Sequence, residues 1–128
     1  MTQTSIPKWQ IVTGWVLSGI LALPFLLSAF VKIMQPDGFL DEWTKNYPAE
    51  AARPLEIVEL AMYVLYLFPK TRYLGGLIML GYLGGAVATH VHMGDGLFPV
   101  PIVVGIIAWL GLYLRDRKLR ALLPTVDE

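Results

Sequence analysis

Long apolar stretches separated by short polar segments dominate the chain. Four of them predict transmembrane helices, because about 20 apolar residues in a helix cross the hydrocarbon core of a bilayer. They cover residues 9–34, 54–68, 73–91 and 98–114. The second is short for a span, so we expect its helix to begin upstream, within residues 49–53. The predicted fold class is all-α: a transmembrane four-helix bundle forming a single membrane domain over residues 1–128.

Two features modify this simple pattern. Pro24 lies inside the first apolar stretch and should kink it, because proline has no N–H for the helical hydrogen bond. The polar outer loop of residues 35–53 contains Asp41, Glu42 and Trp43, which fit the start of a short amphipathic helix at the membrane interface. An ordinary solvated loop fits the same residues equally well.

Lysine and arginine are unevenly distributed over the connections. The turn at residues 69–72 and the tail after residue 114 are rich in basic side chains, whereas residues 93–97 carry only Asp95 as a charged group. The positive-inside rule then places both termini and the second turn in the cytoplasm. Four spans also require both termini on one side. We therefore expect an integral protein of the plasma (inner) membrane of a bacterium-like cell, surrounded by membrane lipid.

The composition agrees with a membrane protein and excludes several function classes. Charged residues make up 16% of the chain, against about 25% in soluble domains. The formal net charge is zero, so no acidic or basic tail is available to drive binding to nucleic acid. The absence of cysteine excludes disulfides, zinc–thiolate sites, cysteine-ligated iron–sulfur clusters and any thiol relay carried by this chain.

The predicted orientation gathers the ionisable residues of the spans near the outer face. Such residues within a membrane are functional candidates by default. They can bind a ligand or exchange a proton, and an ion pair that only locks helices together is the alternative. The candidates, including two aromatic side chains that could line a pocket, are Lys32, Glu56, Glu59, His90, Tyr63 and Tyr82.

His90 has several interpretations. The favoured one is a hydrogen bond to Glu59, and a solvated histidine at the interface is another. His90 and Glu59 are also conceivable ligands of a metal ion, but a metal or haem site is the least favoured interpretation, and no metal is predicted. No nucleophilic triad is visible, so the catalytic residues stay unknown.

Small residues mark the third predicted span. Gly81 and Gly85 form a small-xxx-small pair, as do Gly84 and Ala88. This spacing lets the backbones of neighbouring helices approach closely, so we expect these four residues to pack helices together.

Several segments resemble a known family. The runs YPAEAARPLEIVELAMYVLYLFPKTRYLGG, GYLGGAVATHVHMGD and WLGLYLRDRKLRALLP, with LSAFVKIMQP at the end of the first span, resemble the DoxX-like family of small four-span membrane proteins. The resemblance maps the family's acid in span two onto Glu59 and its Thr-His pair onto Thr89 and His90. It implies the fold strongly and the activity weakly. The family name comes from a subunit linked to thiosulfate:quinone oxidoreduction.

Three functions are consistent with these features. The first is a redox-accessory subunit that binds a lipophilic ligand such as a quinone near the outer leaflet. The second is a structural or chaperone-like scaffold that forms a homodimer, or pairs with a partner membrane subunit, through the glycine-rich helix. The third, a small transporter, is less favoured because four spans leave little room for an aqueous path. Without cysteine, any sulfur chemistry would have to occur on a bound species or a partner.

Overall fold

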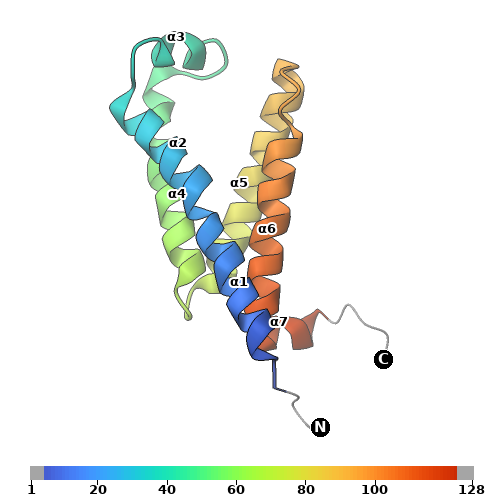
Figure 1. Ribbon diagram of the computed structural model, residues 1–128. Helices are drawn as coiled ribbons and strands as arrows, with labels where there is room; N and C mark the ends of the chain where they lie inside the picture. The colour runs from blue at the N-terminus through green and yellow to red at the C-terminus, as the bar shows by residue number, and fades with distance from the viewer. Residues whose placement is uncertain (1–4, 124–128) are drawn as a thin grey trace.

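The computed structural model describes residues 5–123, which form helices and turns without any strand (Figure 1). The predicted all-α class is confirmed. Two helical stretches, Lys8–Met34 and Arg72–Met93, are long and apolar enough to cross a membrane. The helices in chain order are α1 (Lys8–Ile20), α2 (Ala22–Met34), α3 (Phe39–Trp43), η1 (Ala49–Ala51), α4 (Ala52–Leu67), α5 (Arg72–Met93), α6 (Pro99–Arg115) and α7 (Arg117–Leu122).

The first apolar stretch is interrupted at Leu21, between α1 and α2. Pro24 lies one turn further on and cannot donate a hydrogen bond to the carbonyl of Ile20, which explains the break. The two halves have different neighbours: α1 packs against α6, and α2 packs against α4. The first stretch therefore joins two parts of the molecule.

The remaining contacts complete the bundle. Helix α5 packs against both α4 and α6. At the end that holds both termini the helices are gathered, whereas at the opposite end α2 and α4 diverge from α5 and α6 (Figure 1). We call these the terminal end and the distal end. The buried core lies between them and includes Leu21, Phe25, Met62, Tyr66 and Met79.

Close helix contacts occur at glycines other than the predicted ones. A Cβ added to Gly14 would lie 2.8 Å from the carbonyl oxygen of Gly111, so α1 and α6 meet backbone to backbone. A Cβ at Gly75 would overlap the backbone of Tyr66, at the contact of α5 with α4. These positions tolerate no side chain because the neighbouring atoms belong to the backbone.

The prediction that the Gly81/Gly85 and Gly84/Ala88 pairs pack helices of this chain together is wrong. A Cβ added to Gly81, Gly84 or Gly85 would meet nothing within 4 Å, and Ala88 is exposed. The physical reason is the divergence of the bundle toward the distal end, which carries α5 away from close backbone contact there.

Candidate functional site

A buried ion pair joins α2 to α4 in the distal half of the bundle. Lys32 Nζ lies 2.7 Å from Glu59 Oε2, and the two side chains are only 11% and 6% exposed. Ser28, one turn before Lys32 on the same face of α2, donates from Oγ to Glu59 Oε2 at 2.9 Å. The carboxylate thus accepts two hydrogen bonds, one of them charge-assisted, which fixes its position.

Tyr82 brings α5 into the same cluster. Lys32 Nζ lies 3.2 Å from the Tyr82 hydroxyl and 5.9 Å from the centre of its ring, at the edge of cation–π range. Lys32, Glu59 and Tyr82 therefore bring together side chains of three helices, α2, α4 and α5.

Glu56 lies one turn before Glu59 on the buried face of α4. It is 1% exposed, and neither carboxyl oxygen has a hydrogen-bond partner among the described residues. Glu56 therefore lies on the same buried face as Glu59 without taking part in the ion pair with Lys32.

A cavity of about 300 Å³ opens next to this cluster, with Lys32 and Tyr82 in its wall. Leu55 of α4 also lines it, together with Gly81 and Gly85 of α5. These two glycines leave the space open because they have no side chains to fill it. Their role in the chain is to form part of a cavity wall.

The polar loop covers the distal side of the cavity. The predicted short helix is present as α3, and Phe39, Trp43 and Tyr47 stack in a row, with ring centres 5.6 Å and 4.6 Å apart. The Tyr47 hydroxyl bonds to Thr89 Oγ1 of α5 at 2.5 Å. Trp43, Tyr47 and Thr89 line the cavity. The family resemblance singled out Thr89, whereas Trp43 and Tyr47 were not predicted as site residues. Phe39, Trp43 and Tyr47 recur at every fourth position within the polar loop, and this spacing could have indicated that Trp43 and Tyr47 share one face.

His90 does not join the cluster, and the predicted hydrogen bond to Glu59 is wrong. Its Nδ1 lies 2.7 Å from Asp95 Oδ2, in the connection that follows α5. His90 is two turns beyond Tyr82 and lines a neighbouring cavity of about 310 Å³ under α3. The Leu97 N–H and the His90 ring both bond to the Asp95 carboxylate and hold its pKa below the ordinary value.

Tyr63 also lies apart from the cavity. Its hydroxyl donates to the carbonyl oxygen of Ser18 at 2.9 Å, and its ring packs against Phe25 and Tyr66 in the core. On α4, the Glu59 carboxylate therefore contacts Lys32 of α2, whereas the Tyr63 hydroxyl contacts the backbone of α1. Within residues 5–123, no three histidine or carboxylate side chains come together as metal ligands, and His90 and Glu59 belong to separate interactions.

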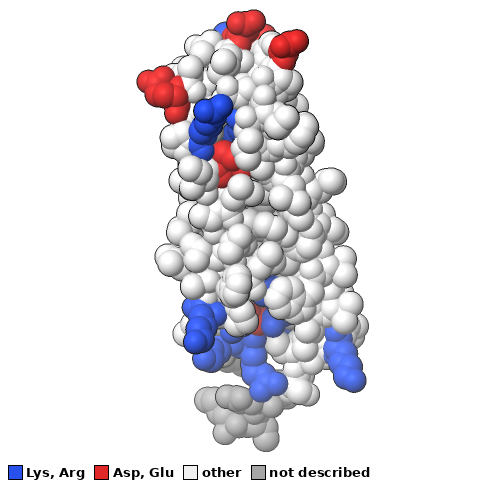
Figure 2. Space-filling view, turned by 90° about the vertical axis from the view of Figure 1, so that its left-hand side faces the viewer, with Lys and Arg blue, Asp and Glu red and all other residues white. Residues whose placement is uncertain are grey.

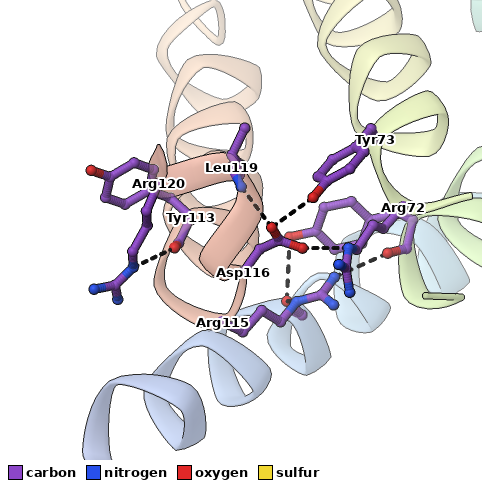
Figure 3. A network of polar contacts seen from close by, with 9 residues as sticks. Arg72, Tyr73, Tyr113, Arg115, Asp116, Leu119 and Arg120 are labelled. Atoms are coloured by element: carbon purple, nitrogen blue, oxygen red, sulfur yellow. Dashed lines mark hydrogen bonds and ion pairs between the residues drawn. The ribbon is translucent and has the colours of Figure 1, made fainter. Parts of the chain in front are cut away.

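A second polar network at the terminal end was not predicted (Figure 3). Asp116 is buried between α6 and α7, where it pairs with Arg72 and accepts a 2.7 Å hydrogen bond from Tyr73. Arg115 donates to Ser18 Oγ and to the carbonyl oxygen of Tyr66, each at 3.0 Å. Basic residues that the sequence assigned to solvated connections therefore hold α1, α4, α5 and α6 together. Asp116 is the single acidic residue in the run RDRK, and this pattern could have indicated an ion pair with a neighbouring basic side chain.

Comparison with known proteins gives one result for the family. A family model described as the DoxX-like family matches residues 16–111, which include α2 to α5, most of α6 and every member of the cluster around Lys32. No curated protein and no solved structure matches the chain.

Proposed function

Since the chain belongs to the DoxX-like family, we propose that it is an integral membrane protein whose distal cavity binds a lipophilic molecule with a polar head, of which a quinone is the best example. The observation that carries the proposal is the position of the buried Lys32–Glu59–Tyr82 cluster in or beside the wall of a cavity of about 300 Å³. Ligand sites in membrane bundles combine apolar walls with a few convergent polar groups in this way.

The chemistry of the cluster suits a quinone head group. The Lys32 ammonium and the Tyr82 hydroxyl are donors for a quinone carbonyl oxygen, and the Glu59 carboxylate is an acceptor for a quinol hydroxyl. Reduction of a quinone to a quinol takes up two protons and two electrons. This chain would bind the head group and exchange its protons, while a partner redox enzyme would supply the electrons, as expected of a redox-accessory subunit.

The proposal includes four spans with both termini in the cytoplasm. Lysine and arginine gather at the terminal end of the molecule, and acidic side chains lie at the distal end (Figure 2). By the positive-inside rule, this distribution favours a cytoplasmic terminal end and a cavity near the outer leaflet of the plasma membrane of a bacterium-like cell.

Ligand retention by purified variants tests the proposal. The full chain in detergent is equilibrated with a short-chain benzoquinone, and the bound quinone is measured after gel filtration. Tyr82→Phe removes a hydroxyl from the cavity, and Gly81→Leu fills the cavity from its wall. Both should lower retention at least tenfold. The matched controls, Tyr63→Phe and Gly84→Leu, change residues outside this cavity and should retain the quinone. Unchanged retention in Gly81→Leu would reject the site.

A scaffold function is the second candidate, and the exposed surface of α5 favours it. Gly84 and Ala88 are exposed and one turn apart, so a helix of another protein could approach them closely. Gly84→Leu should then break a homodimer or a complex with a partner subunit while leaving quinone retention unchanged. Tyr82→Phe should leave the complex intact. The two functions are thereby distinguished, because Tyr82→Phe should affect only quinone retention and Gly84→Leu should affect only complex formation.

A further inference from the structure

Helix α7 turns sharply away from α6 at the terminal end (Figures 1 and 3). Asp116 has extended backbone angles, which end α6, and its Oδ1 accepts a 2.7 Å hydrogen bond from the Leu119 N–H as the cap of α7. The same carboxylate is tied to Arg72 and Tyr73 of α5. Arg120 donates to the carbonyl oxygens of Tyr113 and Leu114, the last turn of α6. Helix α7 is therefore held in a fixed position beside the bundle.

This position creates an apolar cavity of about 280 Å³ between α5, α6 and α7. Leu77 and Leu80 line it from α5, and Leu112 lines it from α6. Helix α7 contributes Leu119, which is buried, and Leu122, which is 72% exposed. Leu77 is 70% exposed as well, so the cavity is open to the surroundings between α5 and α7. Its occupant must be apolar along most of its length.

The surroundings of the cavity are basic. Residues 98–123 carry one carboxylate, Asp116, which is buried and already bonded. Lys118 is exposed on α7, the helix that contributes Leu119 and Leu122 to the wall of the cavity. Lysine and arginine are concentrated at this end of the molecule (Figure 2). An occupant with an anionic head and an apolar tail matches both the charge and the lining.

We propose that this cavity holds one acyl chain of an anionic phospholipid, with its phosphate near Lys118. The chain enters between Leu77 and Leu122, and the head group stays at the interface, where α7 lies with Leu119 toward the bundle. Basic residues at such depths attract anionic head groups. The proposal concerns the opposite end of the molecule from the quinone site and requires only that the terminal end lie at a membrane–water interface.

Native mass spectrometry of the full chain in detergent tests the proposal. The protein is titrated with phosphatidylglycerol or with phosphatidylcholine of the same acyl chains, and the bound fraction of each is measured. We expect phosphatidylglycerol to bind preferentially to the unmodified chain. Lys118→Gln should lower its binding about fivefold, the usual effect of one interfacial lysine. Lys45→Gln, which changes an exposed lysine of the distal loop, is the matched control.

The acyl chain is tested by closing the cavity. Leu77→Trp should reduce binding of phosphatidylglycerol, whereas Leu23→Trp, at a comparably exposed position of α2, should not. Leu122→Gln, which makes the exposed wall of the cavity polar, should also reduce binding of phosphatidylglycerol. It provides the test if Leu77→Trp fails to fold. Equal binding of the two lipids, or phosphatidylglycerol binding unchanged in both Lys118→Gln and a folded cavity variant, would overturn the proposal.

Discussion

Lys32 of α2 and Glu59 of α4 form a buried ion pair, with 2.7 Å between the ammonium nitrogen and the carboxylate oxygen. The pair lies where the bundle begins to open and beside the cavity that Lys32 lines. It can therefore stabilise the contact between α2 and α4 and at the same time present polar groups to a ligand. Stability and ligand retention must be measured separately to distinguish the two roles.

The cost of breaking this ion pair is the first prediction. Lys32→Met should lower the free energy of unfolding by about 3–5 kcal/mol, because it leaves the Glu59 carboxylate buried without its cation. The double variant Lys32→Met/Glu59→Gln should recover much of the loss, because the remaining amide carries no charge. Denaturation in mixed micelles measures both values. If Lys32→Met costs no more than Lys45→Met, an exposed control, the pair does not stabilise the fold.

Glycines of α5 provide the second prediction. Gly75→Ala should destabilise the protein by at least 1–3 kcal/mol, because its Cβ would overlap the backbone of Tyr66, which cannot move aside without disturbing α4. Gly81→Ala is the matched control in the same helix. It should be neutral or stabilising by up to about 1 kcal/mol, because the space is open and alanine favours helix. Thermal unfolding should show a lower melting temperature for Gly75→Ala and an unchanged or higher one for Gly81→Ala, and equal losses would contradict the packing described.

The third prediction concerns the attachment of α7. Asp116→Ala removes the cap of α7 and its ties to Arg72 and Tyr73, so α7 should detach from the bundle. Trypsin should then cleave after Arg117, Lys118 or Arg120 much faster than in the unmodified chain. Glu42→Ala, which removes an exposed carboxylate at the distal end, is the control and should leave this cleavage rate unchanged. Equal cleavage rates for Asp116→Ala and the unmodified chain would show that α7 is held by other contacts.

The fourth prediction is a pH dependence at the distal end. The pKa of Asp95 is lowered in the folded protein by the Leu97 N–H and by His90. The contribution of Asp95 to stability is therefore fully present above its ordinary pKa, and it is lost as the pH falls through the lower, folded pKa. A carbon NMR titration of the Asp95 carboxyl group in micelles should give a midpoint below that of an unstructured aspartate. His90→Ala should move the midpoint upward, and a midpoint at the ordinary value would contradict the contacts.

Part of this structure followed from the sequence for simple physical reasons. Apolar stretches predicted the long helices because their length and composition are constrained by the bilayer, and Pro24 predicted the interruption because it lacks an N–H. The proximity of Lys32 and Glu59 followed from their comparable depth along the predicted spans, whereas Tyr82 was named only as an aromatic side chain that could line a pocket. The depth of a residue in the membrane depends only on its position along a spanning helix, and this position can be counted in the sequence.

The rotation of each helix could not be predicted in the same way. Glu59 and Tyr63 are one turn apart on α4, yet Glu59 pairs with Lys32 of α2, whereas the Tyr63 hydroxyl reaches across the interruption to the carbonyl oxygen of Ser18 in α1. Gly75 and Gly81 lie on the same helix, but an added Cβ would overlap the backbone of Tyr66 at Gly75 and meet no atom within 4 Å at Gly81. Asp116 could not be assigned because its burial depends on α7, a helix that the sequence treated as part of a basic tail.

The helix that begins the chain changes its packing partner at Leu21, from α6 to α4, and this has a consequence for how its two halves can move. Since α1 packs against α6 and α2 packs against α4, a change of angle at Leu21 would move α2 relative to the α1–α6 pair. At the terminal end, Arg115 and Asp116 hold the helices together. At the distal end, Tyr47 in the loop after α2 is hydrogen-bonded to Thr89 of α5. The width of the distal cavity therefore depends on two features, the angle at Leu21 and the contact between Tyr47 and Thr89.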